Sequence, residues 1–304
     1  MKQSATKQNY EIPGASKSVE EILRKHVSTS IFRQVFNYKR FNPMQTVVSE
    51  YVLQSNDNIT VASPTGSGKT CIFELALVKM FSDEHNQPTS SYQNINPKAI
   101  YLAPSKSLVQ EKIAMWKHKF GSLGKNVVEL TSDSVETEGN NFMDLVIEAD
   151  IICGTAEKFD SCTRKWRDNL QAEKLVLNLK LILLDEIHTV GEEKRGSALE
   201  AVITRIKLIK AELRDSIKRG EGCIASHDPV SFCRMIALSA TLPNIVSIAV
   251  LHVNHAKEFH IVLTLHLILK GRYWRMASMQ ANTHIFIWFP VSTCQIRTKI
   301  LHVW

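Results

Sequence analysis

The stretch ASPTGSGKT, residues 62–70, follows the short apolar run 59–62 and leads into a segment with helical spacing of apolar residues, 69–81. A loop that leaves a strand, turns on glycines and enters a helix points backbone N–H groups and the positive end of the helix at one spot, which suits a phosphate. Gly66 and Gly68 permit that turn. The stretch therefore predicts a phosphate-binding loop between a strand and a helix.

The chemistry of this loop predicts how it binds a nucleotide. We expect the Lys69 ammonium to neutralise the β- and γ-phosphates and the Thr70 hydroxyl to bind Mg²⁺. The first glycine of the usual G-x-x-x-x-G-K-[ST] pattern is replaced by Ser63. We expect the whole loop to contact the nucleotide, namely Ser63, Pro64, Thr65, Gly66, Ser67, Gly68, Lys69 and Thr70.

Short β-branched runs alternate with segments of helical spacing along most of the chain. The runs are 59–62, 99–103, 126–130, 150–153, 179–184 and 234–238, and the helical segments include 43–54, 69–81, 107–120 and 197–217. Two polar stretches, 82–97 and 219–230, are typical of loops. Parallel strands need long crossovers, so the alternation predicts an α/β fold, a doubly wound parallel sheet with helices on both faces. Ligands of such sheets bind at the carboxyl ends of the strands.

LILLDEIH, residues 181–188, predicts the second half of the nucleotide site. Its four apolar residues indicate a buried strand, and Asp185 at the carboxyl end of that strand is expected to hold Mg²⁺ through water. Glu186 is then placed to orient or deprotonate the attacking water. Lys69, Asp185 and Glu186 are the expected catalytic residues, and ATP with Mg²⁺ is the expected cofactor.

Composition and charge limit the other possibilities. The longest apolar run, 259–269, is well short of the roughly 20 residues that cross a bilayer. The N-terminus lacks the apolar core of a secretory signal, which favours a reducing intracellular compartment. The six cysteines include no CxxC pair and predict neither a zinc site nor a disulfide framework. The net charge of +7 comes mostly from the chain after residue 245, so a nucleic-acid function depends on particular loops.

GSGKT, DEIH and SAT, in that order, resemble motifs I, II and III of the superfamily 2 helicases, specifically the DExH-box kind. FNPMQ, residues 41–45, resembles the segment of that family whose glutamine, here Gln45, reads the adenine edge. The resemblance spans about residues 10–244 and implies a RecA-like domain of the P-loop NTPase class. It also implies that three residues couple the nucleotide to the nucleic acid, namely His188, Ser239 and Thr241.

Two further segments imply the substrate. LAPSKSLVQEK, residues 102–112, resembles motif Ia, and GTAEKFD, residues 154–160, resembles motif Ib. In the family these loops hold the sugar-phosphate backbone of a single strand without reading its sequence. The implied nucleic-acid contacts are Pro104, Lys106, Ser107, Thr155 and Lys158. Outside these motifs, the two lysines would be interpreted as ordinary solvated side chains.

SCTRKWRDN, residues 161–169, and SATLPN, residues 239–244, make the chain most similar to the large Ski-like DExH group, and within it to the meiotic crossover DNA helicases. This resemblance implies ATP-dependent 3′–5′ unwinding in meiotic recombination, in the nucleus, on single-stranded nucleic acid with DNA favoured over RNA. An RNA helicase of the same group is an alternative, because both share these motifs. A catalytically deficient fragment that binds nucleic acid or a partner is another.

The resemblance ends after SATLPN, where the family continues into a second RecA-like lobe with arginine fingers. We expect three parts: an N-terminal lead-in, 1–36; the ATP-binding domain, 37–245; and a tail outside the family pattern, 246–304, that is poorly ordered. The tail is interpreted as an alternative or mispredicted carboxyl end, with a basic binding tail as the alternative. Arginine fingers supply roughly 10³ to 10⁵ of the rate in related reactions. We therefore expect residues 1–304 to bind ATP weakly, turn it over slowly and not unwind a duplex.

Overall fold

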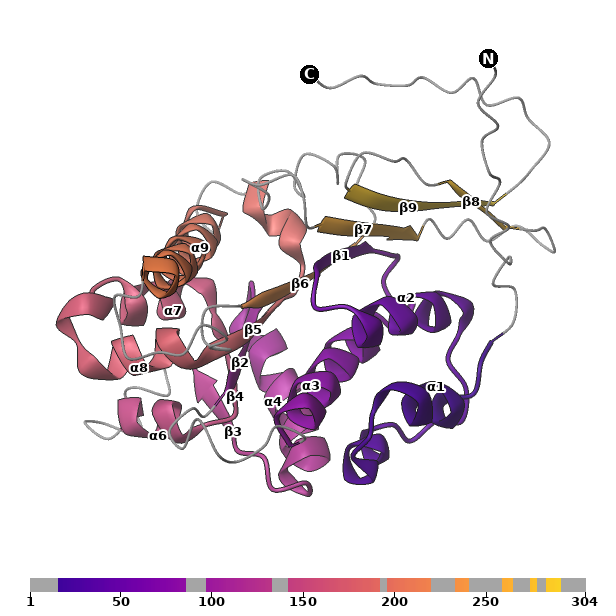
Figure 1. The fold of residues 1–304 in the computed structure, drawn as a ribbon, viewed down its shortest axis with the longest axis horizontal. Helices are drawn as coiled ribbons and strands as arrows, with labels where there is room; N and C mark the ends of the chain where they lie inside the picture. The colour runs from indigo at the N-terminus through magenta and orange to yellow at the C-terminus, as the bar shows by residue number, and fades with distance from the viewer. Residues whose placement is uncertain are drawn as a thin grey trace, which may run out of the picture.

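The computed structural model has a parallel sheet with helices on both faces, which confirms the predicted fold class (Figure 1). The structure describes residues 16–85, 97–132, 142–191, 196–219, 233–240, 259–264, 274–277 and 283–290. The strands β3-β4-β2-β5-β6-β1 lie side by side in this order, and each neighbouring pair is parallel. Their bounds are β1 Asn58–Ala62, β2 Lys98–Ala103, β3 Val127–Leu130, β4 Ile151–Thr155, β5 Leu179–Leu184 and β6 Arg234–Ser239.

Two groups of helices cover the two faces of this sheet (Figure 1). One face carries α1 (Val19–His26), α2 (Pro43–Gln54), α3 (Thr70–His85) and α4 (Lys106–Gly121), with the short 3₁₀ helix η1 (Ser30–Val35). The other face carries α6 (Phe142–Glu148), α7 (Ala156–Thr163), α8 (Leu170–Asn178) and α9 (Gly196–Arg219). The remaining short helices are η3 (Trp166–Asp168) and η4 (Ile187–Gly191).

The central strands are buried on both faces, because successive side chains of a strand point to opposite sides. In β2, Tyr101 and Ala103 pack in the cluster under α3 and α4, whereas Ile100 and Leu102 pack under α6 to α9. All six residues of β2 are buried. This double burial explains why the strands are continuous apolar runs in the sequence and not alternating patterns.

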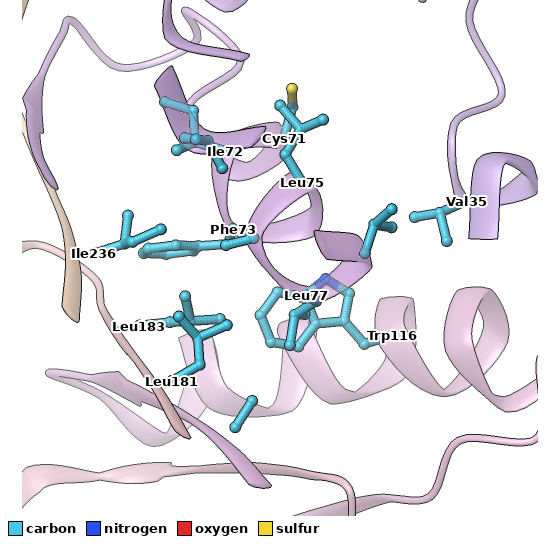
Figure 2. Packing of buried hydrophobic residues seen from close by; sticks show 14 of the residues in the cluster. Val35, Cys71, Ile72, Phe73, Leu75, Leu77, Trp116, Leu181, Leu183 and Ile236 are labelled. Atoms are coloured by element: carbon cyan, nitrogen blue, oxygen red, sulfur yellow. The ribbon is translucent and has the colours of Figure 1, made fainter. Parts of the chain in front are cut away.

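Helix α3, which follows the phosphate-binding loop, is anchored in the core on the α2–α4 face. Figure 2 shows Phe73 of α3 pointing toward Ile236 of β6 and Leu183 of β5. Trp116 of α4 lies on the other side of α3, beside Leu77. Because α3 is fixed by the sheet and by α4, the loop at its N-terminus is held at both ends.

Helix boundaries follow local signals, with two corrections. The predicted helix 43–54 is α2, which begins at the N-cap Asn42 with Pro43 as its first residue, a favoured pairing. The helix expected over 69–81 continues to His85, so the predicted loop 82–97 was wrong over its first four residues. The longer helix is supported by packing, since Ser82 is buried and Lys125 pairs with Glu84 at 3.2 Å. The predicted loop 219–230 was wrong at its first residue, because Arg219 is the last residue of α9. Residues 86–96 and 220–230 of the two predicted loops lie outside the described residues.

The chain beyond β6 adds strands to the sheet. β7 (Phe259–Thr264) pairs in parallel with β1, β9 (Thr283–Pro290) pairs in parallel with β7, and β8 (Trp274–Ala277) is antiparallel to β9. These strands are the described parts of the predicted tail, whose other residues lie outside the description. At the other end, α1 and η1 of the predicted lead-in pack in the same core as α2 and α3. In the described part of the chain, no helix has the length and apolar character required to cross a bilayer.

Candidate nucleotide and nucleic-acid site

The order of the strands brings the predicted nucleotide residues together. β6 lies between β1 and β5, so the carboxyl ends of these three strands meet at one edge of the sheet. Ala62 of β1 is paired with Ser239 of β6, and the N–H of Ser63 donates to the carbonyl of Ser239 at 3.1 Å. The phosphate-binding loop starts at the end of β1, and Asp185 directly follows β5. This edge is where a doubly wound sheet binds its ligands.

The loop itself has the backbone that a phosphate cradle requires. Gly66 has φ of 81° and Gly68 has φ of 80°, the left-handed region in which a side chain is strained. Ser63, which replaces the first glycine of the usual pattern, is fully buried, and its hydroxyl donates to the Ser67 hydroxyl at 2.7 Å. Serine in place of glycine at this position therefore adds a hydrogen bond within the loop.

Lys69 lies between the loop and the end of β6. Its ammonium donates to the carbonyl of Ser63 at 2.5 Å and to that of Ser239 at 2.9 Å. Burial lowers the pKa of Lys69, and the carboxylates of Glu186 and Asp185 oppose this by raising it. The catalytic roles expected of Lys69, Asp185 and Glu186 stay predictions.

The N-terminus of α2 holds the far side of the loop. The Asn42 amide donates to the carbonyl of Ser67 at 3.0 Å, and the Gln45 amide donates to the carbonyl of Gly68 at 3.1 Å. Gln45 also accepts from the N–H of Asn42 at 2.9 Å, as the second half of a capping box. Both ends of the Gln45 amide are thus bonded within the protein. The adenine contact expected of Gln45 stays a prediction.

The predicted magnesium ligands, Thr70 and Asp185, each have a partner from the β2–α4 unit. The Tyr101 hydroxyl donates to Asp185 Oδ2 at 2.7 Å, and the Lys112 ammonium donates to Thr70 Oγ1 at 3.4 Å. Burial and then the charge of Asp185 raise the pKa of Tyr101, so its hydroxyl keeps its proton and donates it. A hydroxyl and a carboxylate are hard oxygen donors, which is the ligand type that Mg²⁺ prefers. The donor set therefore fits the ion.

Glu186 lies beside His188, one of the three residues that were expected to couple nucleotide and nucleic acid. Its Oε2 accepts from the N–H of Ala240 at 3.3 Å and lies 3.2 Å from His188 Nδ1. His188 Nδ1 is in turn 3.4 Å from the Ser239 hydroxyl. Glu186 has a φ of 48°, an uncommon value for a residue other than glycine. Thr241 lies outside the described residues.

The predicted nucleic-acid residues lie at the ends of two neighbouring strands. β2 and β4 are adjacent, and Ala103 at the end of β2 is paired with Thr155 at the end of β4. Thr155 caps α7 by accepting from the N–H of Lys158 at 3.4 Å. On the β2 side, Pro104 is half-buried and Ser105 caps α4, whose first residues, Lys106 and Ser107, are exposed. The two segments therefore form one strip along the edge of the sheet.

Three residues of the site were not assigned from the sequence: Asn42, Tyr101 and Lys112. Asn42 has a sequence signal, since asparagine followed three residues later by glutamine is a capping-box pattern. Tyr101 and Lys112 have none, because each is a polar residue within an otherwise buried strand or helix face. Their partners belong to other parts of the chain.

Comparisons with known proteins agree with the sequence motifs. The family model for DEAD/DEAH box helicases matches residues 42–248. The chain is 37% identical over 240 residues to the probable ATP-dependent DNA helicase HFM1 of Mus musculus, a match that covers 78% of this chain and 14% of that protein. It is 36% identical over 233 residues to the ATP-dependent DNA helicase MER3 of Saccharomyces cerevisiae, covering 77% of this chain and 17% of that protein.

Solved structures agree on the fold. The DEAD-box helicase Mss116 bound to single-stranded RNA and UDP-BeF superposes with a TM-score of 0.61 at 18% identity, over 84% of this chain and 47% of that one. At this identity the likeness concerns the fold alone. The chain spans less than a fifth of the length of the mouse and yeast relatives.

Proposed function

Because the chain belongs to the DEAD/DEAH box helicase family, we propose that its parallel sheet is the ATP-binding lobe of an ATP-dependent DNA helicase. The observation that carries the proposal is the meeting of Lys69, Asp185 and Glu186 at the adjoining ends of β1, β6 and β5. These are a cation for the phosphates, a carboxylate for a metal ion and a carboxylate for water.

The roles of the side chains follow from their positions. Mg²⁺ bound with ATP supplies the positive charge that stabilises the transferred phosphoryl group. The backbone N–H groups from Thr65 to Gly68 cradle the phosphates, and Lys69 neutralises them. Thr70 would hold the metal ion with its hydroxyl, and Asp185 would hold it through water. Glu186 orients the attacking water or takes its proton, and the N–H of Ala240 keeps its carboxylate at the end of β6.

The strip at the ends of β2 and β4 is proposed to hold a single strand by its backbone. Lys106 and Lys158 contribute charge, while Ser107 and Thr155 contribute hydroxyls and lie beside helix N-termini, where anions bind well. The proposed preference for DNA, the nuclear location and a part in meiotic recombination with 3′–5′ polarity are supported by the resemblance to DNA helicases of that group. His188 and Ser239 are proposed to couple the two sites, because His188 lies against Glu186 and the Ser239 hydroxyl lies against His188.

Nucleotide binding and turnover test the proposal first. We expect residues 1–304 to bind a fluorescent ATP analogue in the presence of Mg²⁺, and Lys69→Ala to abolish the binding. Lys25→Ala is the matched control, because Lys25 is exposed on α1 and the charge change is the same. We expect turnover to be slow, since arginines from a second lobe provide much of the rate in this class of reaction. Nucleotide binding that survives in Lys69→Ala would refute the assigned site.

Strand preference is the second test. Lys106→Ala and Lys158→Ala should each weaken binding of single-stranded DNA and lower the salt dependence of the affinity by about one counterion. Lys117→Ala is the control for Lys106→Ala, because Lys117 is exposed on the same helix. Tighter binding of single-stranded RNA than of DNA by the unmodified chain would favour the RNA-helicase alternative.

A further inference from the structure

We propose that Tyr101 is a positioning residue for the metal site, and that its hydroxyl fixes the carboxylate of Asp185 in the orientation that binds magnesium through water. The observation behind this inference is the hydrogen bond that Tyr101 donates to Asp185 Oδ2 at 2.7 Å. The inference rests on the proposed function, since it concerns a ligand of that nucleotide site. Tyr101 itself touches neither the metal ion nor the phosphates in this role and acts through Asp185.

The pairing of β2 with β5 brings the two side chains together. Tyr101 is paired with Leu183, and Asp185 lies two residues beyond Leu183, so it points to the same face of the sheet. The side chain of Tyr101 spans this offset to reach the carboxylate. The N–H of Asp185 also donates to the carbonyl of Leu102 at 2.9 Å. β2 therefore holds both the backbone and the side chain of Asp185.

The Tyr101 ring is fixed by packing. It is fully buried, and it lies edge-on to Phe73 of α3 and Trp116 of α4, with ring centres 5.8 Å and 5.3 Å away. Phe73 and Trp116 come from different helices, so the ring is held from two sides (Figure 2). A buried hydroxyl requires a partner, which Asp185 provides. Because Thr70 begins the helix that carries Phe73, this packing places Asp185 relative to the other proposed metal ligand.

Both oxygens of the Asp185 carboxylate are bonded within the protein. Oδ2 accepts from the Tyr101 hydroxyl, and Oδ1 accepts from the N–H of Glu186 at 3.0 Å. A carboxylate has about four acceptor sites, so these two bonds set its orientation and use about half of them. Mg²⁺ usually keeps several of its waters, which need a fixed acceptor. Partners that orient a metal-binding carboxylate strongly affect metal affinity, and the Tyr101 hydroxyl is such a partner.

Nucleotide affinity with and without Mg²⁺ tests this role. Binding of a fluorescent ATP analogue by residues 1–304 is titrated in Mg²⁺ and in EDTA, and the ratio of the two affinities measures the contribution of the metal ion. We expect Tyr101→Phe to lower this ratio about tenfold, the low end of the effect of removing a partner of a metal ligand. Binding in EDTA should be unchanged, because the ring and its packing are kept. Tyr51→Phe, which removes a hydroxyl from a half-buried tyrosine of α2, should behave as the unmodified chain.

A double-mutant cycle distinguishes positioning from a general effect on the fold. If Tyr101 acts through Asp185, Tyr101→Phe should lower the ratio no further in a chain that already carries Asp185→Ala. A loss of packing alone would instead weaken binding in Mg²⁺ and in EDTA alike. Urea denaturation of each variant establishes that the chains compared are folded.

Each contrary result has a distinct meaning. An unchanged or raised ratio in a folded Tyr101→Phe chain would overturn this inference and leave the proposed function intact. A further fall of the ratio in the Asp185→Ala background would show an effect that bypasses Asp185, and failure of Tyr101→Phe to fold would show that the hydroxyl serves folding. Either result would also overturn the inference. An unmodified chain that binds no nucleotide, or gains no affinity from Mg²⁺, would refute the proposed site and this inference with it.

Discussion

Replacing Gly68 by alanine tests how the N-terminus of α2 shapes the phosphate-binding loop. Gly68 has φ of 80°, where a side chain costs about 1–2 kcal/mol. A Cβ atom there would lie 2.4 Å from Gln45 Nε2, so the amide must move and lose its 3.1 Å bond to the carbonyl of Gly68. That bond is worth about 0.5–1.5 kcal/mol. We therefore expect Gly68→Ala to lower the free energy of unfolding by roughly 2–3 kcal/mol.

Gly66 provides the matched control. Its φ is 81°, but a Cβ atom there would have no neighbour within 4 Å. Gly66→Ala should therefore cost only the backbone strain, about 1–2 kcal/mol. The difference between the two variants, about 1 kcal/mol, isolates the contact with Gln45.

Urea denaturation measures the cost of the backbone strain and of the lost Gln45 contact. The variants needed are Gly66→Ala, Gly68→Ala, Gln45→Ala and the double variant Gln45→Ala/Gly68→Ala. In the Gln45→Ala background, Gly68→Ala should cost no more than Gly66→Ala does in the unmodified chain. Affinity for a fluorescent ATP analogue should fall more in Gly68→Ala than in Gly66→Ala. Equal losses of stability in the two glycine variants, or an unchanged cost of Gly68→Ala without Gln45, would falsify the reasoning.

Two further predictions concern buried charges. Burial lowers the pKa of Lys98 from 10.5 to about 8 in the folded chain, whereas the pKa in the unfolded chain is about 10.4. Between about pH 8 and pH 10.4 the unfolded state therefore binds more protons than the folded state. The free energy of unfolding rises with pH over this range as a result. Urea denaturation at about pH 8 and pH 10 measures this. From about pH 8 to pH 10 the free energy of unfolding of the unmodified chain should rise relative to that of Lys98→Met, by at most about 1.4 kcal/mol per pH unit. The same pH dependence in the two chains would contradict this prediction. Asp160 accepts from Arg205 at 2.6 Å and also binds Arg164, so Asp160→Asn should cost about 1–3 kcal/mol in the same assay. Glu212→Gln, which breaks an exposed pair with Arg167, should cost under about 1 kcal/mol, and similar losses in the two variants would contradict the assignment.

Local patterns in the sequence predicted the elements and the fold class. The strands β1 to β6 coincide with the apolar runs within one or two residues, because strands buried on both faces must be continuously apolar. The glycines of the phosphate loop and the carboxylates after β5 are also local signals, since the turn and the strand end are each encoded in a few consecutive residues. The end of α3 was missed because contacts with distant residues, such as Lys125 with Glu84, extend the helix into a polar stretch.

The sequence by itself determined that this chain has a phosphate-binding loop, an acidic strand end and an alternating α/β architecture, because each depends on residues close together in the chain. Only the tertiary structure decided that β6 lies between β1 and β5, which puts Lys69 against the carbonyl of Ser239. It also decided that Gln45 is bonded to Gly68 and that Lys112 lies on Thr70. Such contacts join residues 23 to 170 positions apart. They arise from the packing of helices on the sheet, which no local periodicity encodes.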